Sequence, residues 1–179
     1  SKNYIPYSFN NLCLLIETMK SILPINLAFD RVVGNLAQLP FDEGIEIAVC
    51  GRSNSGKSSI INALGNNKKL AKTSKTPGRT QTVNFFTIND DPQTKLVDLP
   101  GYGYAKVSKA QKKDWRKLIR TYLKGRASLR ACFVLIDSRH GIKEVDSEIM
   151  ELLDEAGVVY RIILTKIDKA KKSELDDVI

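Results

Sequence analysis

Eight residues, GRSNSGKS at 51–58, combine glycine, lysine and serine at the spacing G-x-x-x-x-G-K-S. Gly51 and Gly56 allow the backbone to fold closely around phosphate oxygens, with its N–H groups pointing inward. Lys57 supplies a positive charge for terminal phosphates, and Ser58 offers a hydroxyl to Mg²⁺. The alternative is a glycine-rich turn without a ligand. A strand-like run before the loop and a helical pattern after it favour phosphate binding.

A second chemical feature is Asp98 in the segment LVDLPG. A carboxylate at the end of a buried strand beside a phosphate loop can hold Mg²⁺ through a water molecule. Gly101 would offer its backbone N–H to a terminal phosphate, so that the loop after it responds to hydrolysis. The alternative for Asp98 is a solvated side chain at a strand end.

The segment TKID at 165–168 also follows an apolar run. Asp168 can accept hydrogen bonds from the N1–H and 2-amino groups of guanine, whereas adenine would leave the carboxylate unpaired. An unpaired buried group costs about 1–3 kcal/mol, which is enough to select the base. The stem of Lys166 can cover the purine, and Thr165 contributes a hydroxyl. This short motif is weak alone, but its place after the other two favours GTP over ATP.

Strands and helices that alternate from about residue 45 must position these groups. Apolar runs predict strands at 45–50, 82–88, 94–99, 131–137 and 158–165. Amphipathic or capped stretches predict helices at 57–64, 108–124 and 144–156, and a last helix begins near residue 170. The segment NDDPQ predicts a turn that joins the second and third strands as an antiparallel hairpin. The expected fold is α/β, with three layers and a mixed, mostly parallel sheet that has one antiparallel hairpin strand.

Length and composition limit the function classes. The 179 residues suit one domain, and no apolar run approaches the roughly 20 residues needed to cross a bilayer. Cys13, Cys50 and Cys132 have no metal-ligand spacing, and one histidine argues against a zinc site. The chain is therefore expected to be reduced, cytoplasmic and without a membrane partner.

The formal net charge is +8, and the positive charge is concentrated. Residues 101–130 hold ten lysines and arginines but one acidic residue. Helical spacing places five of these cations on one face: Lys109, Lys113, Arg116, Arg120 and Lys124. Such a face predicts a docking surface for a phosphate backbone, and the alternative is a solvated helix face.

Four segments, GRSNSGKSS, TSKTPGRTQTVNFF, LVDLPGYGYA and LTKID, together resemble the EngB family of bacterial GTPases. The resemblance extends from about Leu27 to the end of the chain. It implies a Ras-like G domain at 43–179, preceded by an extension and lead-in helix at 1–42. The family's fifth guanine-contact motif is absent, so the domain is expected to be truncated at its C-terminus.

The resemblance also implies roles for individual residues. Ser58, Thr80 and Asp98 would hold Mg²⁺, and residues 78–82 would form switch I around GTP or GDP. The expected catalytic groups are Lys57, Thr80, Gly101 and Asn54. The full set expected to contact the nucleotide and its metal is Gly51, Arg52, Ser53, Asn54, Ser55, Gly56, Lys57, Ser58, Gly78, Arg79, Thr80, Gln81, Thr82, Asp98, Leu99, Pro100, Gly101, Thr165, Lys166, Ile167 and Asp168.

The water-orienting position of some GTPases falls at or near Tyr102–Tyr104. A phenol is protonated at neutral pH and is a poor general base, so hydrolysis is expected to be slow. The two tyrosines are better explained by packing. Asn54 could hold a K⁺ ion, or could be a turn residue; Arg79 could reach the phosphates, or could be a solvated charge. A partner could also supply the missing group.

Two functions remain open. The family assists assembly of the large ribosomal subunit and is linked to cell division and septation, so one function is a slow GTPase switch on the subunit precursor or its rRNA. The other is a GTP-dependent RNA- or ribosome-binding module in which hydrolysis is incidental. A monomer is expected in both cases. Asp168 disfavours a third reading, a P-loop kinase or ATPase.

Overall fold

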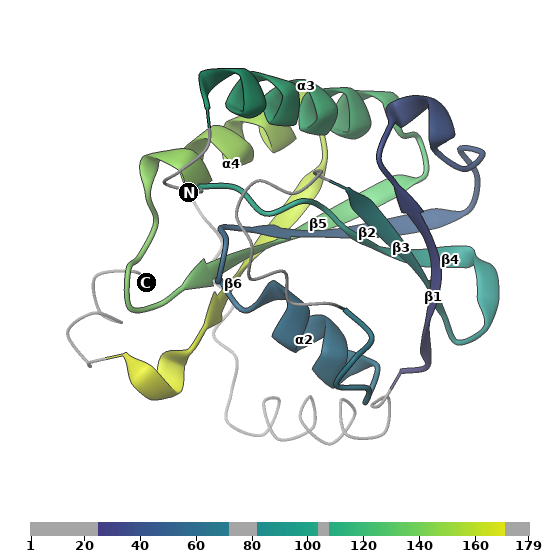
Figure 1. Cartoon of the computed structure of the whole chain (residues 1–179), viewed down its shortest axis with the longest axis horizontal. Coiled ribbons are helices and arrows are strands. Elements are labelled where there is room, and N and C mark those ends of the chain that lie inside the picture. Colours follow the sequence, from purple (N-terminus) through teal and green to yellow (C-terminus); the bar gives the residue numbers. More distant parts are fainter. Residues whose placement is uncertain (1–24, 72–81, 104–107, 171–179) are drawn as a thin grey trace, which may run out of the picture.

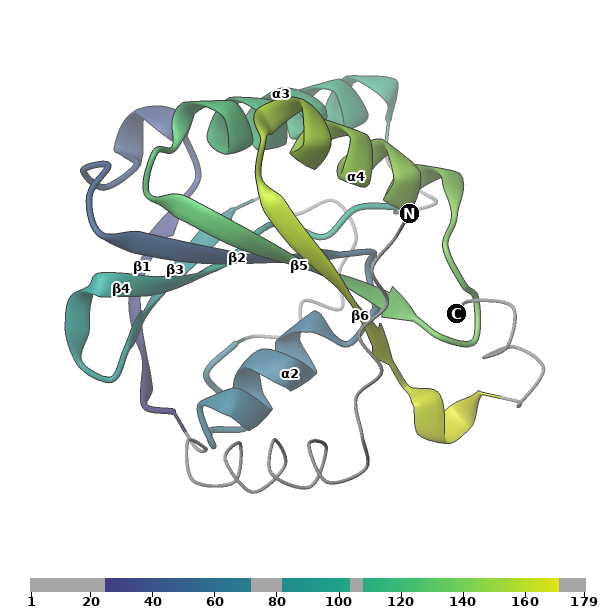
Figure 2. The same cartoon turned by 180° about the vertical axis from the view of Figure 1, so that it is seen from behind.

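The computed structural model describes residues 25–71, 82–103 and 108–170. These residues form a six-stranded sheet in the order β1-β3-β4-β2-β5-β6. The strands are β1 Leu27–Val33, β2 Ile45–Gly51, β3 Val83–Ile88, β4 Asp91–Asp98, β5 Leu129–Asp137 and β6 Val159–Thr165. The helices are α2 Lys57–Leu64, α3 Lys109–Gly125 and α4 Glu144–Ala156, with short 3₁₀ turns η1 Leu36–Gln38 and η2 Ile167–Lys169. Helix α2 covers one face of the sheet, and α3 and α4 cover the other (Figures 1 and 2).

The predicted sheet is confirmed. Strand β3 runs antiparallel to both of its neighbours, whereas β4, β2, β5 and β6 pair in parallel. Helix α3 begins with the predicted capping box, in which Ser108 and Gln111 exchange side chain–backbone hydrogen bonds. Of the described helices, none is long and apolar enough to cross a membrane.

Strand β1 is an addition to the prediction, which assigned residues 1–42 to an extension with a lead-in helix. The strand pairs with β3 from Leu27 opposite Ile88 to Val33 opposite Val83, so it belongs to the same sheet. Its pattern is hard to recognise because only the two end residues are buried, and the register shifts within the strand. The expected helix in the first 24 residues lies outside the described residues.

The hairpin turn is shorter than predicted. Strand β4 begins at Asp91, and the turn consists of Asn89 and Asp90, with φ of 53° and 59°. Two consecutive positive φ angles match the twist of a two-residue hairpin, and asparagine and aspartate tolerate them. A register shift leaves Pro92 without a partner on β3, which accommodates its missing N–H.

The core has two layers because successive strand residues point to opposite faces of the sheet. On β2, Ala48 and Cys50 pack toward α3 and α4, and Val49 packs toward α2. The layer under α3 includes Trp115, Ile119 and Tyr122, as its amphipathic pattern predicted. Cys50 and Cys132 are buried free cysteines in that layer.

Candidate functional site

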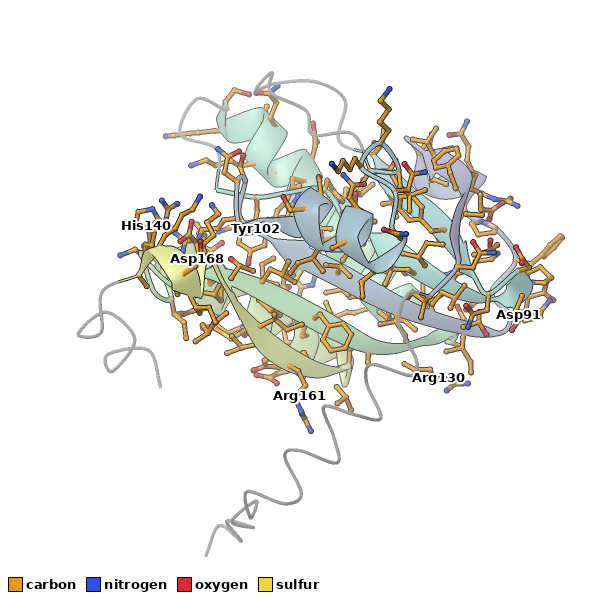
Figure 3. All side chains as sticks on the ribbon, turned by 90° about the horizontal axis from the view of Figure 1, so that it is seen from below. Asp91, Tyr102, Arg130, His140, Arg161 and Asp168 are labelled. Atoms are coloured by element: carbon orange, nitrogen blue, oxygen red, sulfur yellow. The ribbon has the colours of Figure 1, made fainter. Side chains whose placement is uncertain are left out.

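The predicted chemical groups meet at one edge of the sheet. Strands β4, β2, β5 and β6 are parallel, so their carboxyl ends lie at the same edge. Figure 3 shows Tyr102 and Asp168 at this end of the molecule and Asp91, where β4 begins, at the other end. Since β2 lies between β4 and β5, the loop after β2 is placed between Asp98 and the base motif.

The loop at 51–58 has the backbone that its glycines allow. A Cβ added at Gly51 would lie 2.4 Å from Ser55 Oγ and 2.9 Å from the carbonyl oxygen of Leu135. Gly56, the residue before α2, has a φ of 93°, and Asn54 has a φ of 64°. A side chain at Gly51 would clash with Ser55 and with β5, so glycine allows this close packing, and the loop fits a role in which backbone amides surround a phosphate group.

Asp98 lies beside Lys57 at the end of β4. Its Oδ1 forms an ion pair with Lys57 Nζ, and its Oδ2 accepts a hydrogen bond of 3.2 Å from Asn84 Nδ2. Asp98 is buried, and Ser58 follows Lys57 in the first turn of α2. A carboxylate and a hydroxyl are hard oxygen ligands, so these groups suit Mg²⁺. Gly78, Arg79, Thr80 and Gln81 lie outside the described residues, and Thr82 immediately precedes β3.

The backbone after Asp98 returns to the phosphate loop. The N–H of Leu99 donates to the carbonyl of Val49 at 3.0 Å, and the N–H of Ser53 donates to the carbonyl of Tyr102 at 2.8 Å. A Cβ at Gly101 would lie 3.6 Å from the carbonyl oxygen of Gly51. The Pro100–Gly101 peptide is therefore held against the loop.

Tyr102 packs in the core, which supports the packing explanation of this tyrosine. Its ring lies 5.5 Å from the ring of Trp115, and its hydroxyl donates to Asp146 at 2.8 Å. Burial raises the pKa of the Tyr102 phenol well above its ordinary value, so the group stays protonated. Tyr104 lies outside the described residues.

The base motif is fastened to the phosphate loop by two side chains. Thr165 Oγ1 donates to the carbonyl of Ser55 at 2.6 Å, and Lys166 Nζ donates to the carbonyl of Asn54. The Thr165 hydroxyl thus serves to link two loops. Asp168 is exposed in η2 and has no ion pair with another described residue.

Asp137 at the end of β5 was missed by the sequence analysis. Its Oδ2 accepts a hydrogen bond of 2.7 Å from Lys166 Nζ and another of 2.7 Å from Arg139 Nη2. The bonds from Arg139, and next those from Lys166, hold the pKa of this carboxyl well below its usual range, although burial opposes them. An apolar run that ends in aspartate, as in LVD, was the signal that could have identified it.

The basic face of α3 has more of its cations in ion pairs than its sequence indicated. Three of its five cations form ion pairs with glutamates of α4. These pairs are Arg116–Glu148, Arg120–Glu155 and Lys124–Glu155, the last two at 2.8 Å and 3.1 Å. Lys109 and Lys113 are exposed and have no ion pair within the described part of the chain. The prediction considered the charge of one segment and did not place α4 beside it.

Known proteins are similar to this chain in sequence. A family model described as a 50S ribosome-binding GTPase matches residues 46–166. The probable GTP-binding protein EngB of Bradyrhizobium diazoefficiens is 50% identical over 161 residues, which cover 90% of this chain and 74% of that protein. That of Rhodospirillum rubrum is 53% identical over 148 residues, or 81% of this chain and 64% of that protein.

Solved structures agree on the fold. A crystal structure of a probable GTP-binding protein engB has a TM-score of 0.55 at 20% identity, covering 72% of this chain and 73% of that one. Aquifex aeolicus Era bound to GDP and AlF₄⁻ also has a TM-score of 0.55 at 20% identity, covering 76% of this chain and 45% of that one. With the family model and the relatives at about half identity, these matches show that the chain belongs to the EngB family of GTPases.

Proposed function

We propose that this protein hydrolyses GTP slowly and acts as a switch in assembly of the large ribosomal subunit. The supporting observation is the contact between its basic helix and its phosphate corner. Trp115 Nε1 of α3 donates to the carbonyl of Pro100 at 3.1 Å, one residue before Gly101. A change at Gly101 on loss of the γ-phosphate would therefore reach α3 directly. The matching family model, described as ribosome-binding, points to the same partner.

The described residues include most of the groups that would hold the nucleotide. The amides of the loop at 51–58 and the ammonium of Lys57 would bind the phosphates, and the Gly101 N–H would meet the γ-phosphate. Ser58 and Asp98, with Thr80, would hold Mg²⁺. These residues would thereby bring a positive charge that offsets the negative charge of the phosphates. Asp168 would accept from guanine, while Asp137 and the Asn54 carbonyl hold Lys166 in position.

We expect slow hydrolysis because Tyr102, at the position where some GTPases orient water, is a poor general base. Tyr102 is protonated and engaged with Asp146, so it does not orient water. Phosphoryl transfer depends mainly on positioning and charge stabilisation. A cation or a partner must then complete the site.

Replacing Na⁺ by K⁺ should raise turnover by on the order of tenfold if Asn54 holds the cation, because added positive charge stabilises the transition state. The measurement is phosphate release at constant ionic strength. Asn54→Gly is a matched variant, since glycine keeps the positive φ of 64° and removes the amide. It should abolish the K⁺ effect without loss of GDP affinity. Equal rates of the unsubstituted protein in the two salts would exclude this role.

Docking on RNA should depend on the cations of α3 that have no acidic partner among the described residues. Lys113→Glu should weaken binding to large-subunit particles by on the order of tenfold and reduce its salt dependence by about one phosphate contact. The matched control is Arg130→Glu, a charge reversal at the far end of the sheet (Figure 3). Arg120→Glu is less informative because it would place two carboxylates together and disturb the contact with α4. Equal losses for Lys113→Glu and Arg130→Glu would show that only total charge matters.

A time course of GTP hydrolysis with and without large-subunit particles tests the switch itself. Strong stimulation by the particles supports the switch. Binding without stimulation favours the second candidate, a GTP-dependent RNA-binding module. That candidate remains because α3, the helix that carries the cations, contacts the phosphate corner through Trp115 whether or not hydrolysis is used.

A further inference from the structure

Two clusters, each made of one tyrosine, one arginine and one buried carboxylate, occupy opposite ends of the sheet. We call them the Asp146 cluster (Arg52, Tyr102 and Asp146) and the Glu46 cluster (Glu46, Tyr122 and Arg126). In each, a buried tyrosine donates its hydroxyl to a buried carboxylate, at 2.8 Å in the first and 2.7 Å in the second. An arginine pairs with each carboxylate.

The Asp146 cluster joins the phosphate loop to α4. Asp146 is 0% exposed, and its Oδ2 accepts a hydrogen bond of 2.8 Å from the N–H of Lys143. The same Oδ2 lies 3.1 Å from Arg52 Nε, close enough for an ion pair although not aligned for a hydrogen bond. Arg52 Nη2 also donates to the carbonyl of Gly141 at 2.8 Å. Asp146 thus fixes Arg52 of the loop and, through Oδ1, the side chain of Tyr102.

Anchoring Arg52 and Tyr102 also restrains the backbone that leads from Asp98 to Tyr102. Arg52 and Tyr102 form a parallel bridge, and the N–H of Tyr102 donates to the carbonyl of Gly51 at 3.4 Å. Gly101 precedes Tyr102, and on its other side Leu99 is bonded to β2. The direction of the Gly101 N–H therefore depends on where Tyr102 is anchored. Gly103 follows with a φ of 73°, so the chain turns away after this anchor.

We propose that Asp146 is a positioning residue that, through Tyr102 and Arg52, aims the Gly101 N–H at the γ-phosphate and so adds to the affinity of the site for GTP but not for GDP. The inference rests on the proposed role of Gly101. It explains why a tyrosine stands in this loop: its hydroxyl is an anchor and takes no part in the chemistry. The added affinity is limited to GTP because only GTP carries the phosphate group that the Gly101 N–H would contact.

The Glu46 cluster performs no such task and therefore provides a control. Glu46 lies at the amino end of β2, and Arg126 Nη1 donates to the carbonyl of Pro40 at 2.7 Å. The Glu46 cluster holds the β1–β2 connection against the end of α3, and it lies away from the carboxyl edge of the sheet. Removal of the Tyr122 hydroxyl is thus chemically matched to removal of the Tyr102 hydroxyl.

The test compares Tyr102→Phe with Tyr122→Phe in the complete 179-residue chain. The affinities for GDP and for a non-hydrolysable GTP analogue are measured by calorimetry, with kcat and KM for GTP. Tyr102→Phe should lower the affinity for the analogue about tenfold and kcat by a similar factor, because the lost bond had an ionised acceptor. Its GDP affinity should stay within about twofold, since GDP makes no contact with the Gly101 N–H.

Tyr122→Phe should lower the melting temperature by a comparable amount and leave the ratio of the two affinities unchanged. A loss of stability alone therefore cannot produce the expected result. Asp146→Asn is the second variant, and it should change the ratio in the same direction because it also removes the charge that pairs with Arg52. If Tyr102→Phe and Tyr122→Phe give the same ratio and the same kcat, the proposal is wrong.

The outcome separates this inference from the ribosomal proposal. The assays contain no ribosomal particles, so a protein that ignores ribosomes could still show the Tyr102 effect. If Tyr102→Phe lowers the affinities for GDP and for the GTP analogue by the same factor, Gly101 is not aimed at the γ-phosphate through Tyr102 and the inference is overturned at that point.

Discussion

Lys57→Ala should reduce the affinity for both GDP and GTP by on the order of a hundredfold, because a hydrogen bond to a charged group contributes about 1.5–3 kcal/mol. Lys57 is the cation of the phosphate loop and stands at the first turn of α2. No other side chain in the described part of the loop can replace it, since Arg52 is engaged with Asp146 and Gly141. Calorimetric titration with each nucleotide and Mg²⁺ measures the loss.

The same substitution should also lower stability without nucleotide. Lys57 pairs with Asp98, which is 5% exposed, so its removal leaves that carboxylate with Asn84 as its described partner. An uncompensated buried charge is costly. Lys69→Ala, an exposed lysine in the loop after α2, should change neither quantity. Unchanged GTP affinity of Lys57→Ala would contradict the phosphate-loop assignment.

Asp168→Asn should change the preferred base. The carboxylate would accept from two donors of guanine, whereas an amide would present its own N–H to one of them. The affinity for GTP should fall by on the order of a hundredfold. The affinity for XTP should rise, because xanthine has a carbonyl where guanine has the 2-amino group, and this carbonyl can accept from the amide of Asn. Competition titrations with GTP and XTP give the ratio.

This variant should not alter stability, because Asp168 is exposed and has no ion pair with another described residue. Asp114→Asn, which neutralises an exposed carboxylate on α3, controls for the charge change. An unaltered GTP/XTP ratio for Asp168→Asn would remove Asp168 from the base site. If it were removed, the phosphate loop would still bind nucleotide, but its selectivity would need another source.

The sequence predicts the structure correctly where the structure depends on a single segment of the chain. The strand, loop and helix around residues 45–64 follow from an apolar run, two glycines and a helical pattern, all local features. The capping box of α3 and the glycine after α4 are equally local. The order of parallel strands then places Asp98 and the base motif beside the loop, because their carboxyl ends share one edge.

Contacts between distant segments could not be predicted in the same way. Strand β1 is recognised only by its pairing with β3, about 55 positions later. Asp146 looks like an acidic residue in the first turn of a helix, which is common, and only the fold brings it to Tyr102 and Arg52. The ion pairs between α3 and α4 likewise depend on two helices lying together.

The attachment of Thr165 and Lys166 to the carbonyls of Ser55 and Asn54 has a practical consequence for engineering. These two side chains hold the backbone that we propose binds the phosphates. Selectivity for the nucleobase and affinity for the phosphates would therefore depend on some of the same residues. Grafting a base-recognition segment from an unrelated nucleotide-binding protein would lower the affinity for the phosphates unless those two attachments were retained. Changing Asp168 alone leaves both in place, so a redesigned specificity should begin there.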